Sequence, residues 1–216
     1  MLYLYEELFL LCLHEEKVTV PPAITAQLGN ALGGAILVDL ALANKICVTE
    51  KHRLELVDSE PTGDPLLDET LEKILAVDRH KKIAFWLEKF DFRPKKIFPR
   101  LYRRLVEDGV LKVEDDDFKW GFHDETSTNH PTSAKYALKS RLRDLTLAYE
   151  QADLHQIALL NLLQASEMLD LVFFKDERKV ARRRIDEAMM AEAFKDPLGQ
   201  TLQEIGSGIA ARIDSD

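Results

Sequence analysis

The sequence is poor in cysteine, proline and glycine, with 2, 8 and 9 of these among its 216 residues. The two cysteines, Cys12 and Cys47, lie inside apolar segments and form no CxxC pair, so we expect reduced thiols of a cytosolic protein. The small number of helix-breaking residues and a hydrophobic content of 46% exclude a disordered or low-complexity chain. One domain covering residues 1–216 is the expected organisation.

A net positive charge is also lacking, because 38 Asp and Glu residues outnumber 29 Lys and Arg residues and give a formal net charge of −9. Nonspecific nucleic-acid binding depends on a basic surface that neutralises phosphates, so no nucleic-acid partner is expected. A secretory leader is not expected either, since the apolar residues 2–13 carry Glu6 and Glu7 and have no basic stretch before them. The longest apolar stretch, 157–174, is interrupted by polar residues such as Asn161. We therefore expect a buried helix there, and only peripheral contact with any membrane.

Motifs for metal or cofactor chemistry are missing. The 6 histidines are scattered, with no HExxH and no Cys/His ligand spacing, so no metal ion and no cofactor is expected. The segment Gly29–Gly34 matches neither GxGxxG nor GxxxxGK[ST], and close helix packing is the expected reason for its glycines. No GxSxG motif is present, so the sequence predicts that the protein is not an enzyme. A catalytic triad spread along the chain would leave no such spacing, which keeps an enzyme as a third alternative.

Helical periodicity is the main pattern that is present. Apolar residues recur at spacings of three and four in residues 2–14, 23–43 with a break near Gly33-Gly34, 66–78, 81–90, 96–108, 132–151, 154–174, 176–194 and 198–212. Short strand patterns occur at 46–48, 54–57, 110–113 and 118–122. These patterns predict a mainly α-helical fold, a bundle with surrounding amphipathic helices and a small β-hairpin.

The segment Glu60–Glu69, EPTGDPLLDE, has the features of a turn that starts a helix. Its first proline and its glycine suit a tight turn, and Asp64 can cap the unpaired amide groups of the helix start. Pro65 falls at the first helical position, where its missing N–H costs nothing. The carboxylates of Asp68 and Glu69 are then favoured by the helix dipole. Capping, and not catalysis, is the expected role of these acidic residues.

Six cations gather in the twelve residues from Arg93 to Arg104. On a helix that begins near Lys95 or Lys96, the cations from Lys96 onward repeat at three and four and form one basic stripe. Such a stripe concentrates positive potential and can hold phosphate groups. The candidate headgroup-binding residues are Arg93, Lys95, Lys96 and Arg100. The alternative is a solvated face that makes surface ion pairs; the second cluster, Arg178–Arg184, is expected to be such a face.

The strand patterns at 110–113 and 118–122, joined by 114–117, predict a β-hairpin. Its aromatic residues Phe118, Trp120 and Phe122 alternate onto one face. That face either packs on the helical core or forms an exposed ridge for association, because an apolar face needs covering. The second possibility predicts a homo-oligomer.

Several motifs resemble the Golgi phosphoprotein 3 family, whose members are peripheral Golgi proteins that bind phosphatidylinositol 4-phosphate. The matching segments, in the same order as in the family, are Leu2–Leu13, Leu37–Ile46, Glu60–Glu69, Leu105–Leu111 and Ala158–Leu169. The resemblance covers nearly the whole chain. It implies a helical bundle with a protruding hairpin, and in the family this hairpin mediates self-association.

The resemblance also implies where a headgroup pocket would lie. Family members that bind the lipid use a tryptophan, an arginine and two basic residues, and an alignment without gaps places these at Ile24, Gly33, Lys95 and Phe98. Lys95 alone is retained, so weak headgroup discrimination is expected. The eukaryotic members carry a basic N-terminal tail before the first core helix, and by this comparison we expect a prokaryotic member.

The leading hypothesis is a cytosolic, non-catalytic protein that associates peripherally with a membrane. It would bind an anionic phospholipid headgroup, by resemblance phosphatidylinositol 4-phosphate, through residues 93–104. The alternative is a protein-interaction adaptor that binds no lipid.

Overall fold

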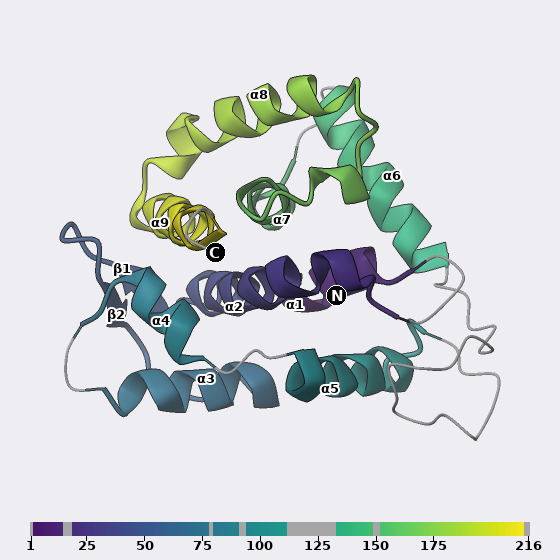
Figure 1. The fold of residues 1–216 in the computed structure, drawn as a ribbon. Helices are drawn as coiled ribbons and strands as arrows, with labels where there is room; N and C mark the ends of the chain where they lie inside the picture. Colours follow the sequence, from purple (N-terminus) through teal and green to yellow (C-terminus); the bar gives the residue numbers. More distant parts are fainter. Residues whose placement is uncertain are drawn as a thin grey trace.

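The computed structural model describes residues 2–14, 19–77, 80–90, 94–111, 133–148 and 152–213. Within these ranges the chain is mainly helical, as predicted (Figure 1). The α-helices are α1 (Leu4–Cys12), α2 (Thr25–Leu42), α3 (Pro65–Leu75), α4 (Ile83–Lys89), α5 (Pro94–Glu107), α6 (Ser133–Leu147), α7 (Leu154–Ala165), α8 (Arg178–Met189) and α9 (Pro197–Ile213). Short 3₁₀ turns are η1 (Pro22–Ile24), η2 (Leu169–Leu171) and η3 (Glu192–Phe194).

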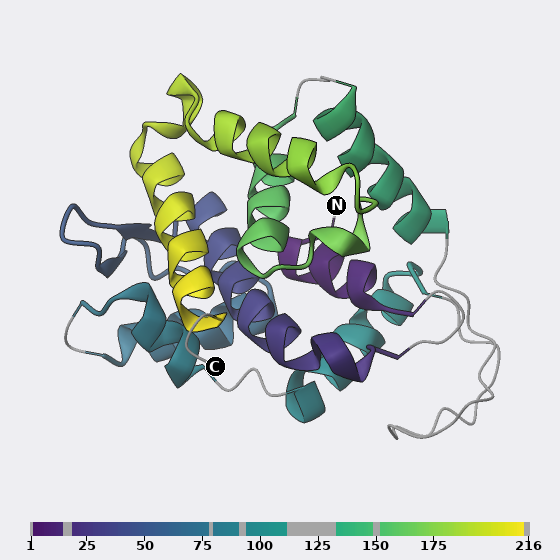
Figure 2. The same ribbon diagram turned by 45° about the horizontal axis from the view of Figure 1, so that its top comes forward.

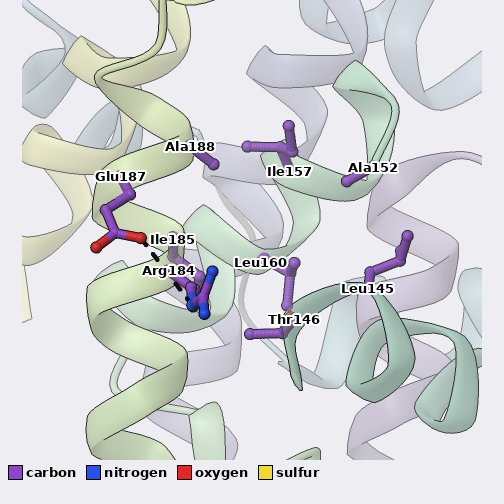
Figure 3. A pocket seen from close by; sticks show the side chains of 9 residues that line it. All are labelled: Leu145, Thr146, Ala152, Ile157, Leu160, Arg184, Ile185, Glu187 and Ala188. Carbon is purple, nitrogen blue, oxygen red and sulfur yellow. Dashed lines mark ion pairs between the residues drawn. The ribbon is translucent and has the colours of Figure 1, made fainter. Parts of the chain in front are cut away.

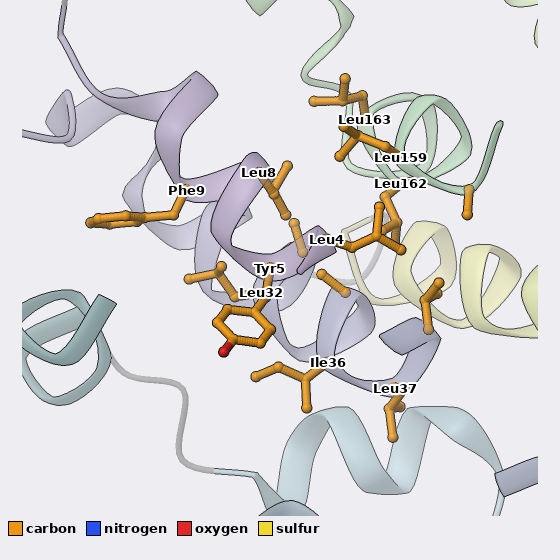
Figure 4. Packing of buried hydrophobic residues seen from close by; sticks show 14 of the residues in the cluster. Leu4, Tyr5, Leu8, Phe9, Leu32, Ile36, Leu37, Leu159, Leu162 and Leu163 are labelled. Atoms are coloured by element: carbon orange, nitrogen blue, oxygen red, sulfur yellow. The ribbon is translucent and has the colours of Figure 1, made fainter. Parts of the chain in front are cut away.

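Helices α1 and α2 form the middle of the molecule. Helices α6, α7, α8 and α9 lie on one side of this pair, and α3, α4 and α5 lie on the other side (Figures 1 and 2). Figure 4 shows Leu4 and Leu8 of α1 near Leu159 and Leu162 of α7, which are all buried. The buried apolar side chains form a cluster to which each of the nine α-helices of the described residues contributes.

Helix α2 is apolar on nearly all sides because it is surrounded by other helices. The stretch Pro22–Leu42 is long and apolar enough to cross a membrane by length and composition. However, 61% of its most apolar window is buried within the protein. Packing against α1, α7 and α9 therefore accounts for its composition without a membrane.

The helix break predicted near Gly33-Gly34 is wrong, since α2 runs through both glycines without interruption. Gly34 marks instead the close approach of α9. A Cβ atom at this position would lie 2.2 Å from Cδ1 of Ile209 and 3.4 Å from Cδ2 of Leu162. The absence of a side chain lets α2 and α9 approach, as the sequence predicts for this glycine.

Two further predictions concern strands. Strands β1 (Ile46–Val48) and β2 (Leu54–Leu56) pair antiparallel, with Ile46 opposite Leu56 and Val48 opposite Leu54. The predicted hairpin at 110–122, with Phe118, Trp120 and Phe122, lies outside the described residues except for Val110 and Leu111.

The helix predicted for 154–174 is shorter than expected. Helix α7 ends at Ala165 because Glu167 adopts a left-handed backbone conformation, φ 57°. The N–H of Met168 then donates to the carbonyl of Leu163 at 2.8 Å, which closes the helix end. The central part of the prediction is confirmed, since α7 is a core helix in which Leu160 and Leu163 are buried.

Candidate headgroup-binding surface

Helix α5 carries the basic segment of the chain. Its inner side is apolar, and Ile97, Phe98 and Leu101 are buried. The ring of Phe98 contacts Phe9 of α1, with 5.3 Å between the ring centroids. This packing fixes the orientation of α5 and leaves the remaining positions, most of them basic, at or near the surface.

Lys95 and Lys96 lie in the first turn of α5, and both are exposed. Lys95 makes no ion pair with any described residue. The N-terminal end of a helix has a positive partial charge and amide groups without partners in the helix, so it favours anions. The two lysines therefore add their charges to an end that is already positive. Arg93, the first predicted site residue, lies outside the described residues.

Arg100 is one turn further along α5 and is held by a carboxylate. Its two terminal nitrogens donate to Glu69 of α3 at 2.9 and 2.7 Å in a fork arrangement. This pairing lowers the pKa of Glu69. The side chains are 44% and 46% exposed, so solvent screens the pair. An incoming phosphate group can reach Arg100 but must displace Glu69.

The sequence predicts that the cations from Lys96 onward form one exposed basic stripe. This prediction is wrong for Arg104. Its side chain is 30% exposed and points inward, where Nε binds Glu6 and a terminal nitrogen binds Asp64. The guanidinium also lies over the ring of Tyr3, 5.4 Å from its centroid. Arg104 therefore compensates buried carboxylates, and a headgroup would have to compete with them.

Asp64 caps the start of α3, as the sequence predicts. Its Oδ1 accepts from the amides of Leu66 and Leu67 at 3.0 and 2.8 Å, with Pro65 at the first helical position. Its other oxygen accepts from the hydroxyl of Tyr5 at 2.9 Å. Burial raises the pKa of Tyr5, so this hydroxyl stays protonated and donates. One carboxylate thus connects α3, α1 and, through Arg104, α5.

Asp68 completes the turn from inside the helix. Its carboxylate accepts from the amide and the hydroxyl of Thr62 at 2.7 and 2.6 Å and from the amide of Gly63 at 3.2 Å. Gly63 has φ 86°, a conformation that favours glycine. Asp64 and Asp68 therefore stabilise the turn and the start of α3, as the sequence predicts.

Asp39 is a polar residue of the core whose role the sequence does not reveal. It caps α1, because its carboxylate accepts from the amides of Leu4 and Tyr5 at 3.0 and 3.2 Å. Burial raises the pKa of Asp39 to about 7, although the two amides act against this rise. Asp39 lies 35 residues from Leu4, so no local spacing pattern could have indicated the contact.

Glu7 forms a second ion cluster at α1. It lies 2.9 Å from Nε2 of His155 on α7 and 3.1 Å from a terminal nitrogen of Arg141 on α6. The hydrogen bond with Glu7 raises the pKa of His155 against the opposing effect of burial. This cluster connects α1 to α6 and α7.

The positions transferred from the family pocket are mostly not at the surface. Gly33 and Phe98 are buried and Ile24 is half-buried, while Lys95 is exposed. Ile24 and Gly33 therefore do not supply the tryptophan and arginine side chains of the family's headgroup pocket. Among the described residues, no group of three or more His, Cys, Asp or Glu side chains could hold a metal ion.

The second basic cluster lies on α8, on the other side of the core from α5 (Figure 1). Lys179 and Arg182 are exposed, and Arg183 lies 3.6 Å from Glu187. Lys179, Arg182 and Arg183 thus match the solvated face that the sequence predicts, whereas Arg178 and Arg184 are only partly exposed.

Comparison with known proteins agrees with this architecture. The family model described as Golgi phosphoprotein 3 matches residues 4–205. An alignment of 161 positions is 29% identical to "Vacuolar protein sorting-associated protein 74" of Eremothecium gossypii, and it covers 65% of this chain and 48% of that protein. The chain thus spans about half the length of this curated relative. It belongs to the Golgi phosphoprotein 3 family.

Proposed function

We propose that this protein is a non-catalytic, cytosolic protein that associates peripherally with a membrane by binding an anionic phospholipid headgroup. The observation that carries the proposal is the exposure of Lys95 and Lys96 together at the N-terminal end of α5 in an otherwise acidic protein. Membership of the Golgi phosphoprotein 3 family supports it, because the resemblance implies binding to phosphatidylinositol 4-phosphate.

The chemistry of the surface suits a phosphate group. The lysine ammonium groups act as point charges, and the helix end adds amide donors. Arg100 joins them when a phosphate displaces Glu69, whose exposed pairing contributes about 1 kcal/mol or less. Arg93, beyond the described residues, extends the same segment by one more cation. Because Lys95 alone keeps a basic residue of the family pocket, we propose weak discrimination among anionic headgroups.

A flotation assay with liposomes tests this function. The probes are vesicles of phosphatidylcholine alone, and the same vesicles with added phosphatidylserine, phosphatidylinositol or phosphatidylinositol 4-phosphate. We expect flotation with the anionic vesicles and none with phosphatidylcholine, and bound protein should decrease steeply with salt. Flotation with no anionic vesicle at 50 mM salt would contradict lipid binding.

One observation favours the second candidate, a protein-interaction adaptor. Arg100 and Arg104 both bind carboxylates of the protein itself, which reduces the charge available to a membrane. In that case the same vesicles would leave the protein at the bottom of the gradient. Self-association through the predicted hairpin with Phe118, Trp120 and Phe122 is compatible with both candidates.

A further inference from the structure

Glu69 of α3 lies against the proposed headgroup surface and binds one of its cations. Its two carboxylate oxygens accept from the two terminal nitrogens of Arg100 at 2.7 and 2.9 Å. An arginine offers the same fork geometry to a phosphate group. Among the described residues, Glu69 is the one carboxylate to which Arg100 donates. Glu69 therefore occupies the position that a pair of phosphate oxygens would take on this guanidinium.

Both side chains of this pair are exposed, so an anion can reach the guanidinium from solvent. A different arginine–glutamate pair, Arg184 with Glu187, lies at a cavity of about 280 Å³ between α6, α7 and α8 and is marked by a dashed line in Figure 3. Nε of Arg184 lies 4.0 Å from Glu187, which is too long for a hydrogen bond, and the arginine side chain is 18% exposed. Of these two pairs, the pair of Arg100 combines hydrogen bonds with access from outside.

Lys73 offers Glu69 a second partner. It follows Glu69 by four residues on α3, and this is the spacing and order in which glutamate and lysine pair best on a helix. The hydrogen bond from Arg100 lowers the pKa of Glu69, and the charge of Lys73 acts in the same direction. Lys73 is exposed and makes no ion pair with the other described residues. The carboxylate can therefore leave Arg100 and still have a cation within reach.

We propose that Glu69 is an intramolecular competitor that lowers the affinity of the headgroup surface for anionic lipids. In the closed arrangement, Glu69 binds Arg100. In the open arrangement, Glu69 turns to Lys73, and Arg100 binds a phosphate group together with Lys95. The inference rests on the proposed function, because it concerns the same surface, and it adds the residue that sets the affinity.

Vesicle binding of matched charge variants tests the competition. The probe is phosphatidylcholine vesicles with added phosphatidylserine, and the measured quantity is the lipid concentration at half-maximal binding. Glu72→Gln is the control, because Glu72 is an exposed carboxylate of the same helix that does not bind Arg100, and its loss changes the net charge equally. Glu69→Gln should lower the half-binding concentration about two- to fivefold further than the control, because this factor corresponds to the free energy of an exposed ion pair.

A double-mutant cycle separates competition from a general effect of charge. In an Arg100→Gln background, Glu69→Gln should change the half-binding concentration only as much as Glu72→Gln does, because the competitor has lost its target. Lys73→Gln should weaken binding by up to about twofold more in the wild type than in Glu69→Gln, because the open arrangement loses its partner. Unchanged helical circular dichroism shows that each variant folds. If Arg100→Gln abolishes binding, the comparison of Glu69→Gln with Glu72→Gln decides.

NMR titration of the Glu69 carboxyl checks the closed arrangement without a membrane. Its pKa should lie below 4.5 in the wild type and rise in Arg100→Gln. The same pKa in both proteins would overturn the inference, whatever the vesicles show.

The vesicle outcomes separate this inference from the proposed function. Binding by the wild type with equal half-binding concentrations for Glu69→Gln and Glu72→Gln would overturn competition by Glu69 and leave lipid binding standing. An Arg100→Gln background that keeps the full gain from Glu69→Gln would have the same meaning. If neither the wild type nor Glu69→Gln binds the anionic vesicles, both the proposed function and this inference are wrong.

Discussion

At the scale of single residues, buried carboxylates organise the fold around α1. Asp64 caps α3 and accepts a hydrogen bond from the hydroxyl of Tyr5. Arg104 forms ion pairs with Asp64 and Glu6 and so compensates their charges. Removing one partner of a buried ion pair leaves an uncompensated charge, which costs more than the pair contributes. The positively charged segment of α5 therefore contains residues with two different roles, one structural and one at the surface.

Replacing Arg104 should show its structural role. We expect Arg104→Gln to lower the free energy of unfolding by about 2 kcal/mol or more, because Glu6 and Asp64 lose their cation. Arg103→Gln, at an exposed position of the same helix, should change it by less than about 0.5 kcal/mol. Urea unfolding followed by circular dichroism measures both. Equal midpoints for the two variants would mean that Arg104 does not support the fold.

The shifted pKa values of His155 and Asp39 predict that stability falls as pH rises. The pKa of His155 is raised above 6.5, so its stabilisation is complete below about pH 6.5 and is lost as pH rises through the folded-state value. The pKa of Asp39 is about 7 against 3.8 for an ordinary carboxyl, so the folded state holds a proton that the unfolded chain releases from about pH 4. Both groups therefore lower the free energy of unfolding as the pH rises from 6 to 8.

Urea midpoints at pH 6 and pH 8 check this prediction. The wild type should unfold at lower urea at pH 8, and His155→Gln should reduce the difference between the two values. His80→Gln serves as the control, since His80 is exposed. The acidic groups with lowered pKa values, such as Asp68 and Glu69, act below about pH 4.5 and do not interfere. A midpoint that rises from pH 6 to pH 8 would contradict the account.

At the scale of elements, the sequence predicts most of the helices because a one-sided apolar pattern and local capping residues determine them. The start of α3 follows from Asp64 and Pro65, and both have the predicted roles. The end of α7 was missed, since a left-handed Glu167 has no reliable signal in one sequence. Contacts between distant residues, such as Asp39 with Leu4, were also missed, because no spacing pattern records them.

The same limit applies to the candidate site. Exposure of Lys95 and Lys96 could be predicted from the periodicity of α5. The inward direction of Arg104 could not, because it depends on the carboxylates of α1 and α3, which only the tertiary structure brings near.

The contact between α2 and α9 gives a prediction at the element scale. Gly34→Ala should lower the free energy of unfolding by about 1–3 kcal/mol, because the new methyl group meets Cδ1 of Ile209. Adding Ile209→Val removes that atom and should restore part of the loss, although it has a cost of its own of about 0.5–1.5 kcal/mol. A double mutant less stable than the sum of the two single effects would mean that the contact is placed wrongly. Urea unfolding of the four proteins gives the coupling.

At the scale of the whole molecule, the layered arrangement separates α5 from α8 (Figures 1 and 2). A flat membrane that touches the start of α5 would leave α8 on the far side of the molecule. The match to the family model over residues 4–205 spans both of these sides of the molecule.

Assembly gives a prediction of its own. If Phe118, Trp120 and Phe122 form an association ridge, Trp120→Asp should shift the protein to a smaller mass in light scattering and leave its helical circular dichroism intact. Loss of the helical signal would instead favour packing of this face on the core.

Flotation with matched charge reversals tests the proposed headgroup surface most directly. Lys95→Glu/Lys96→Glu reverses the start of α5, and Lys179→Glu/Arg182→Glu reverses exposed cations of α8 and changes the net charge by the same amount. Both variants should keep the wild-type circular dichroism. We predict that the α5 variant no longer floats with vesicles containing phosphatidylinositol 4-phosphate and that the α8 variant floats like the wild type. Undiminished flotation of the α5 variant would contradict the account.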